Sequence, residues 1–73
     1  ADRKPATVQE QQEYIVSSFP NIGLNLAKEL LKHFKSVKKI VNASEEELTK
    51  VEGVGEKKAK GIKEISEKEY KKD

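Results

Sequence analysis

The chain has 73 residues, a net charge of +2, one histidine and no cysteine. This length allows one small domain, and the lack of cysteine excludes a disulfide framework and a thiolate zinc site. No apolar run approaches the length of a bilayer span, so we expect no membrane segment and no signal peptide.

The N-terminal part of the chain predicts a linker followed by a helix. Residues 1–6 are polar and show no hydrophobic period, so we expect a linker remnant there. A helix over about residues 8–18 should follow, because Thr7 can cap it and Glu10 stands at the capping-box position. Its expected buried stripe consists of Val8, Ile15 and Phe19, with Tyr14 or Val16.

The middle of the chain predicts three more helices. After a turn at residues 20–25, apolar residues recur at spacings of three and four from Leu26 to Phe34, which is typical of an amphipathic helix. Ser36 and Ser44 each precede a short helical pattern and are expected to cap it. The single histidine, His33, has no second ligand candidate in reach and is expected at the surface.

A second turn, at residues 52–57, leads into the last predicted helix. Its inward residues should be Ala59, Ile62 and Ile65. Gly61 lies inside this helix at a cost of about 1 kcal/mol relative to alanine, which indicates close contact there. No strand pattern occurs, so the sequence predicts an all-α domain of five short helices over residues 7–70, with a frayed tail at 71–73.

The two turns match each other at an offset of 32 residues, which indicates a duplicated unit. Asn21 stands at the position of Gly53, and asparagine is the residue other than glycine that best tolerates left-handed geometry. The other matched pairs are Phe19 with Val51, Ile22 with Val54, Gly23 with Gly55, and Ala27 with Ala59.

Two helices joined by a turn with a glycine–apolar–glycine centre form the helix-hairpin-helix motif, and two motifs in tandem form a five-helix domain. The turn amides and the start of the following helix can hydrogen-bond a phosphate, and adjacent lysines add electrostatic attraction. Such contacts read little base sequence. We expect DNA binding by the second hairpin at Gly53, Val54, Gly55, Glu56, Lys57, Lys58 and Lys60, and by the first at Ile22, Gly23, Leu24, Asn25 and Lys28.

Within these hairpins, Ile22 and Val54 should point inward as core anchors. The lysines between residues 57 and 63 are all expected to be exposed. The alternative is that one or both hairpins only pack a helix pair, and this alternative is stronger for the first hairpin, which has no lysine before Lys28.

Four runs of the chain carry a resemblance to a known family. They are EQQEYIV at residues 10–16, LLKHF at 30–34, ASEEEL at 43–48 and VEGVGEKKA at 51–59. Together they resemble the C-terminal tandem helix-hairpin-helix domain of the archaeal Hef and XPF nucleases. The bacterial UvrC C-terminal domain shares much of the pattern and is the nearest competitor.

The resemblance implies that the parent protein is a structure-specific nuclease, which in Hef is fused to an ATP-dependent helicase. Such a protein acts on forked or branched DNA, such as a Holliday junction, in DNA repair or in the processing of stalled forks. The resemblance also implies that this domain binds DNA and forms a homodimer, in the archaeal cytoplasm at the nucleoid or in a eukaryotic nucleus. The chain departs from the family at Asn21, Leu24, Asn25 and Lys35, which leaves the first hairpin's phosphate contact and the end of the second helix open.

A dimerisation or docking module is the main alternative to DNA binding. Its expected contact residues are Phe19, Leu24, Leu26 and Tyr70. Catalysis by this chain is not expected, because aspartate occurs only as Asp2 and Asp73 and aromatic residues are too few to build a base pocket. We therefore expect no catalytic residue, metal, cofactor or small-molecule ligand.

Overall fold

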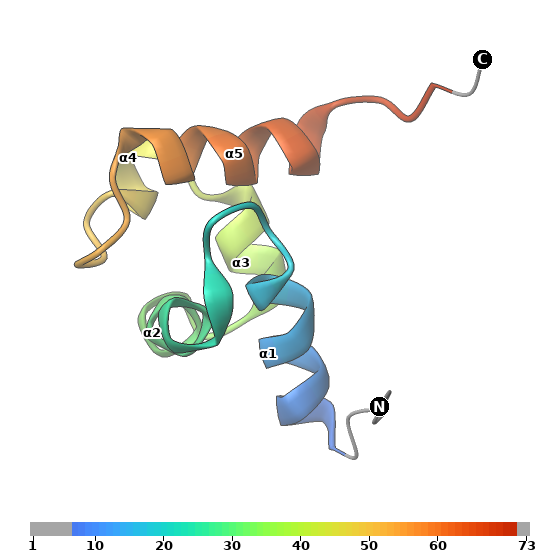
Figure 1. Cartoon of the computed structure of the whole chain (residues 1–73), viewed down its shortest axis with the longest axis vertical. Helices are drawn as coiled ribbons and strands as arrows, with labels where there is room; N and C mark the ends of the chain where they lie inside the picture. Colours follow the sequence, from blue (N-terminus) through green and yellow to red (C-terminus); the bar gives the residue numbers. More distant parts are fainter. Residues whose placement is uncertain (1–6, 72–73) are drawn as a thin grey trace.

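The five predicted helices are present in the computed structural model, which describes residues 7–71 (Figure 1). They are α1 (Val8–Ser17), α2 (Gly23–Phe34), α3 (Val37–Asn42), α4 (Glu45–Leu48) and α5 (Glu56–Glu67). The linker predicted at residues 1–6 and the last two residues of the predicted tail lie outside the described residues. Within residues 7–71, no helix has the length and apolar character that a bilayer crossing requires.

Hydroxyl side chains fix the start of α1, α3 and α4, as predicted for each. The Glu10 N–H donates to Thr7 Oγ1 at 3.0 Å, and the Thr7 N–H donates back to the Glu10 carboxylate at 3.3 Å. Ser36 Oγ accepts from the Lys39 N–H at 3.1 Å. These bonds satisfy amides that have no partner inside the helix.

The start of α4 carries the second complete capping box. Ser44 Oγ accepts from the Glu47 N–H at 3.1 Å, and the Ser44 N–H donates to the Glu47 carboxylate at 2.9 Å. The Ser44 backbone bond is the main reason why the pKa of Glu47 lies below its ordinary value.

Helix α2 ends at a residue with left-handed backbone. Lys35 has φ +79°, and its N–H donates to the Leu31 carbonyl at 2.8 Å. A non-glycine residue rarely takes this conformation. The C-cap of α2 is therefore a lysine at a position where glycine would be less strained.

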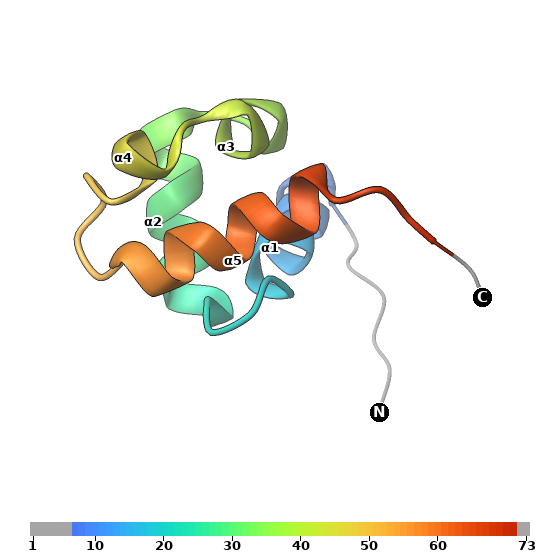
Figure 2. The same cartoon turned by 90° about the horizontal axis from the view of Figure 1, so that it is seen from above.

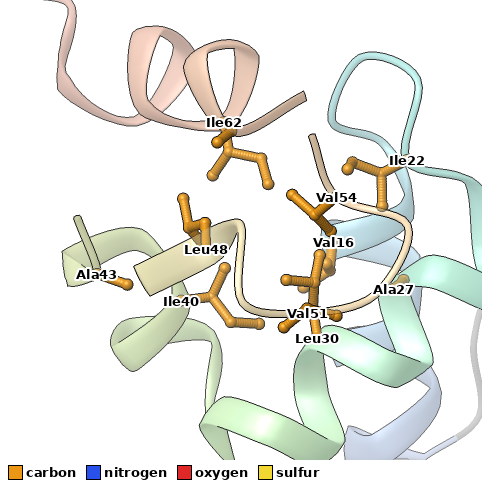
Figure 3. Packing of buried hydrophobic residues seen from close by; sticks show 11 residues of the cluster. Val16, Ile22, Ala27, Leu30, Ile40, Ala43, Leu48, Val51, Val54 and Ile62 are labelled. Carbon is orange, nitrogen blue, oxygen red and sulfur yellow. The ribbon is translucent and has the colours of Figure 1, made fainter. Parts of the chain in front are cut away.

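One apolar cluster holds the helices together (Figure 3). Helix α1 packs on α2, α4 packs on α5, and α3 contacts both α2 and α5. All five helices contribute to the cluster, and the loops before α2 and α5 add to it. Its buried members are Val16, Ile22, Ala27, Leu30, Ile40, Ala43, Leu48, Val51, Val54, Ala59 and Ile62.

The buried faces of α1 and α5 differ from the prediction. Val8, Tyr14 and Ile15 are exposed, and Val16 is the only fully buried residue of α1, because this helix packs chiefly against α2 alone. In α5 the buried residues are Ala59 and Ile62, whereas Ile65 one turn later is 60% exposed. The predicted stripe of Val8 and Ile15 and the inward position of Ile65 are therefore wrong.

Candidate nucleic-acid interface

The two hairpins share the same hydrogen-bonded turn, but they differ after it, because Gly23 at the start of α2 has φ +68° whereas the matched Gly55 has φ −88°. In the first, the Ile22 N–H donates to the Phe19 carbonyl at 3.2 Å, and in the second the Val54 N–H donates to the Val51 carbonyl at 3.0 Å. The third residue of each turn has positive φ. It is Asn21 at +63° in the first turn and Gly53 at +94° in the second, as the type II β-turn requires. Asn21 thus takes the left-handed geometry that the sequence predicted for it.

The apolar residue at the centre of each hairpin is buried, as predicted. Ile22 is 5% exposed and Val54 is 3% exposed, and both point into the common core (Figure 3). They anchor the turns from inside, and the polar backbone on the other side of each turn stays at the surface.

The helices that follow the hairpins begin without side-chain caps. Neither α2 nor α5 has a capping hydrogen bond, whereas α1, α3 and α4 all have one. The first backbone bond into α5 runs from the Ala59 N–H to the Gly55 carbonyl at 3.0 Å. Within residues 7–71, the four N–H groups from Gly55 to Lys58 therefore meet no acceptor.

Gly53 and Gly55 serve different purposes. At Gly53, φ is +94° and a Cβ would lie 3.0 Å from Leu26 Cδ1, so the fold requires glycine there. At Gly55, φ is −88° and no atom lies within 4 Å of a would-be Cβ. Only Gly53 of these two glycines thus has positive φ, and the missing side chain of Gly55 leaves open space at the start of α5.

The two hairpins lie next to each other. Leu26, in the first turn of α2, reaches Gly53 of the second hairpin, and the Pro20 ring of the first hairpin lies 3.8 Å from the Cβ position of Gly61 in α5. Figures 1 and 2 both place the loop between α1 and α2 beside α5. The close contact with another helix predicted at Gly61 is therefore wrong, because the neighbour is a turn residue and an added Cβ would meet it at an ordinary contact distance.

Three of the predicted lysines are free to contact a ligand. Lys28, Lys57 and Lys60 are exposed. Lys58 is half-buried, and its Nζ donates to the Gly53 carbonyl at 3.2 Å, so it supports the hairpin itself. Glu56 is exposed at the first position of α5, where its carboxylate lies beside the uncapped amides.

Lys63 is not part of the exposed basic surface, contrary to the expectation. Its side chain is 13% exposed, and its Nζ donates to the Val41 carbonyl at 2.9 Å and pairs with the Glu67 carboxylate at 3.0 Å. Lys63 thus joins α5 to the end of α3.

The residues predicted for dimerisation fall into two groups. Phe19 and Leu26 are partly buried and pack against the core, whereas Leu24 is 52% exposed and Tyr70 is 87% exposed. The other large exposed apolar residues in the described part of the chain are Val8, Tyr14, Ile15 and Ile65. The hydrophobic pattern predicted Val8, Ile15 and Ile65 in the core, so their exposure could not be predicted from it.

His33 is exposed, as expected, and its ring packs edge-on against Phe34 at a centroid distance of 4.6 Å. Among residues 7–71, no group of three histidine, aspartate or glutamate side chains could hold a metal ion.

Comparison with known proteins gives a consistent result. A model of the SAM-like helix-hairpin-helix tandem family matches residues 15–68. A Methanocaldococcus jannaschii protein, MJ1505, that carries the name of an ATP-dependent RNA helicase is 53% identical over 64 residues, which are 88% of this chain and 8% of that protein. The 3'-flap repair endonuclease Xpf of Saccharolobus solfataricus is 45% identical over 94% of this chain and 29% of its own length.

A solved structure shows the same arrangement of helices. XPF from Aeropyrum pernix, in complex with DNA, superposes with a TM-score of 0.83 and 45% identity over 89% of this chain and 32% of that chain. The chain thus spans less than a third of the length of each of these relatives.

Proposed function

The chain belongs to the family of SAM-like helix-hairpin-helix tandem domains, as its resemblance to Hef and XPF predicted, and on this basis we propose that it binds the phosphate backbone of DNA. The second hairpin is the main contact, through the amides of Gly55, Glu56 and Lys57. The first hairpin adds a second contact at Gly23 to Asn25. A relative of the same fold was solved with DNA, which supports this proposal.

The observation that carries the proposal is the selective absence of helix caps. Among residues 7–71, three helix starts are capped by a serine or threonine, and only the two that follow the hairpins are uncapped. Free amides and the positive end of a helix dipole favour an anion, and the exposed Lys57 and Lys60 strengthen that preference. The backbone of DNA supplies such anions at regular intervals.

The binding should be weak and salt-dependent for a single copy. One phosphate at each hairpin and two more at exposed lysines give about four contacts, for which the slope of log affinity against log salt is about −4. Since backbone contacts carry little sequence information, forked or branched DNA would be distinguished from plain duplex by shape.

Self-association is the second function that we propose. Leu24 and Tyr70 are exposed apolar side chains, and a small domain gains from covering such residues with a second copy. In this proposal the chain is the DNA-binding and dimerising part of a longer Hef- or XPF-like helicase-nuclease that acts near the archaeal nucleoid.

The sharpest test is the substitution Gly55→Ser. Gly55 has the extended backbone of a helix N-cap, at φ −88° and ψ −177°, and has room for a side chain. A serine hydroxyl there would accept from the free amides, as Ser44 does at α4. We expect thermal stability to stay the same or rise, and duplex affinity to fall on the order of tenfold, because a bound phosphate loses about one charge-assisted hydrogen bond.

Two further variants complete this experiment. Lys57→Glu should also weaken binding and make the salt slope shallower by about one. Ser44→Ala serves as the control, because it removes a cap away from the hairpins and should lower stability without changing affinity. Unchanged DNA affinity in Gly55→Ser and Lys57→Glu would show that the second hairpin is only structural.

A further inference from the structure

A second basic surface begins at Lys28, at the edge of the first hairpin, and continues along a groove between α1 and α2. Helix α2 contributes lysines to one wall of this groove, and α1 contributes glutamines and one glutamate to the other. The polar lining residues are Lys28, Lys32 and Lys35 from α2, and Gln9, Gln12 and Glu13 from α1.

The three lysines form a row along α2. Lys28 and Lys32 are four residues apart on one face of α2, and Lys35 follows directly after its last residue, so the row is about 10 Å long at about 1.5 Å per residue. A strand of B-DNA rises about 3.4 Å per nucleotide, so the row matches about three consecutive phosphates. Its first member, Lys28, lies in the second turn of α2, close to the uncapped start of this helix.

The acidic residues near the row do not cancel it. Lys32 pairs with Glu29 at 3.6 Å, but both side chains are largely exposed, and such a surface pair is worth about 0–1 kcal/mol. The pair can therefore open when a phosphate arrives. Glu13 is the one acid that lines the groove, against three lysines.

The groove lies on a different flank of α2 from the second hairpin. In Figure 1, α2 is seen nearly end-on, with α5 above it and α1 below and to the right. The groove faces α1, whereas the second hairpin leads into α5 on the other flank. A duplex held by the two hairpins and Lys28 would thus leave the part of the groove at Lys32 and Lys35 available to another DNA segment.

The chemistry of the lining favours a paired strand over an unpaired one. Single strands are held by aromatic side chains that stack on the bases, and no aromatic residue lines this groove. Lysine ammonium groups and glutamine amides instead donate to phosphate oxygens.

We infer that the groove between α1 and α2 binds the phosphate backbone of a second duplex arm of branched DNA while the hairpins hold the first arm. This inference rests on the proposed function of the hairpins and adds a reason for a preference for branched substrates.

The test compares a plain duplex with a fully paired four-way junction, using the 73-residue chain and the double variant Lys32→Ala/Lys35→Gly. Glycine suits the left-handed backbone at residue 35, so the variant should fold at least as well as the wild type. At about 50 mM salt we expect junction affinity to fall about tenfold and its salt slope to become shallower by about two, with duplex affinity unchanged within twofold.

The matched control is Lys38→Ala/Lys39→Ala, which removes two exposed lysines of α3 outside the groove and should leave both affinities nearly unchanged. The inference would be overturned if the variant lost affinity equally for duplex and junction, or lost affinity for neither. It would also be overturned if the control variant showed the same loss of junction affinity. A loss confined to forks with single-stranded arms would overturn the assignment to a paired arm. If the wild type does not bind plain duplex, or if Gly55→Ser binds duplex as well as the wild type does, the proposed function of the hairpins is wrong. The inference about the groove, which depends on it, is then wrong as well.

Discussion

At the scale of single residues, the two glycines of the second hairpin have different roles. Gly53 is needed for the fold, whereas Gly55 leaves open space at the surface. Gly53 has positive φ and touches Leu26, so any side chain there strains the turn. Gly55 meets neither condition, and its hydrogen atom faces open space beside free amides. The sequence alone identifies both as turn glycines, because backbone angle and neighbouring atoms are set only when the two motifs pack together.

Glu56 gives a prediction about the same amides. Its carboxylate at the first position of α5 is stabilised by the helix dipole, so it competes with a phosphate for the same positive end. We expect Glu56→Gln to raise DNA affinity about two- to fivefold and to lower stability by a few tenths of a kcal/mol. Fluorescence anisotropy with a short duplex measures the first effect, and thermal unfolding measures the second.

The control for this substitution is Glu64→Gln, which removes an exposed carboxylate further along the same helix. A matching gain of affinity in Glu64→Gln would mean that the change reports net charge and not the position beside the amides.

Gly61 gives a prediction about stability. A Cβ at this position would lie 3.8 Å from the Pro20 ring, an ordinary contact distance, and the residue is inside a helix. Gly61→Ala should therefore stabilise the domain by about 1 kcal/mol, the difference in helix propensity. Gly53→Ala should instead destabilise it, and a loss of stability in Gly61→Ala would mean that the hairpin and α5 pack more closely than their described positions allow.

At the scale of elements, α5 carries lysines with two different tasks. Lys60 is exposed, whereas Lys63 binds the Val41 carbonyl at the end of α3. We expect Lys63→Met to cost about 1–3 kcal/mol of unfolding free energy, because it leaves a partly buried carbonyl without its charged donor, and to change DNA affinity less than twofold. Lys60→Met should do the reverse, and a larger loss of DNA affinity in Lys63→Met than in Lys60→Met would contradict this division.

Local sequence signals predicted most of the helices. The features that they did not predict depend on contacts between residues far apart in the sequence. The cap residues Thr7, Ser36 and Ser44 act within three residues of themselves, so the helix starts could be read directly from the sequence. The Lys63 bond to Val41 spans 22 residues and has no local signal. The buried face of the first helix was predicted only in part: Phe19 and the alternative Val16 do pack in the core, whereas Val8 and Ile15 do not, because only contact with α2 selects among its apolar residues.

At the scale of the whole molecule, the contact between the two motifs would, in the proposed function, join two weak anion sites into one surface. The Leu26 contact with Gly53 and the Pro20 contact with Gly61 fix the hairpins relative to each other. Once one hairpin holds a phosphate, the other is held close to the same DNA at a high effective concentration. Binding by the pair therefore exceeds the sum expected from two separate turns.

Self-association of the whole domain can be tested with side chains that the core does not use. Leu24→Ser and Tyr70→Ser remove exposed apolar groups, so each should weaken a dimer in sedimentation equilibrium with unfolding free energy unchanged within about 0.5 kcal/mol. Phe19→Ala and Leu26→Ala are poorer probes, because both side chains pack against the core and their loss should cost about 2 kcal/mol or more.

A second pair of exposed residues distinguishes two positions for the dimer contact. Val8 and Ile15 are seven positions apart on α1, on one face of the helix, and both are exposed. If the dimer forms through Leu24 and Tyr70, the double variant Val8→Ser/Ile15→Ser should sediment like the wild type. Loss of the dimer in this variant alone would place the contact on α1, and it would also explain why that helix keeps apolar side chains that its own core does not bury.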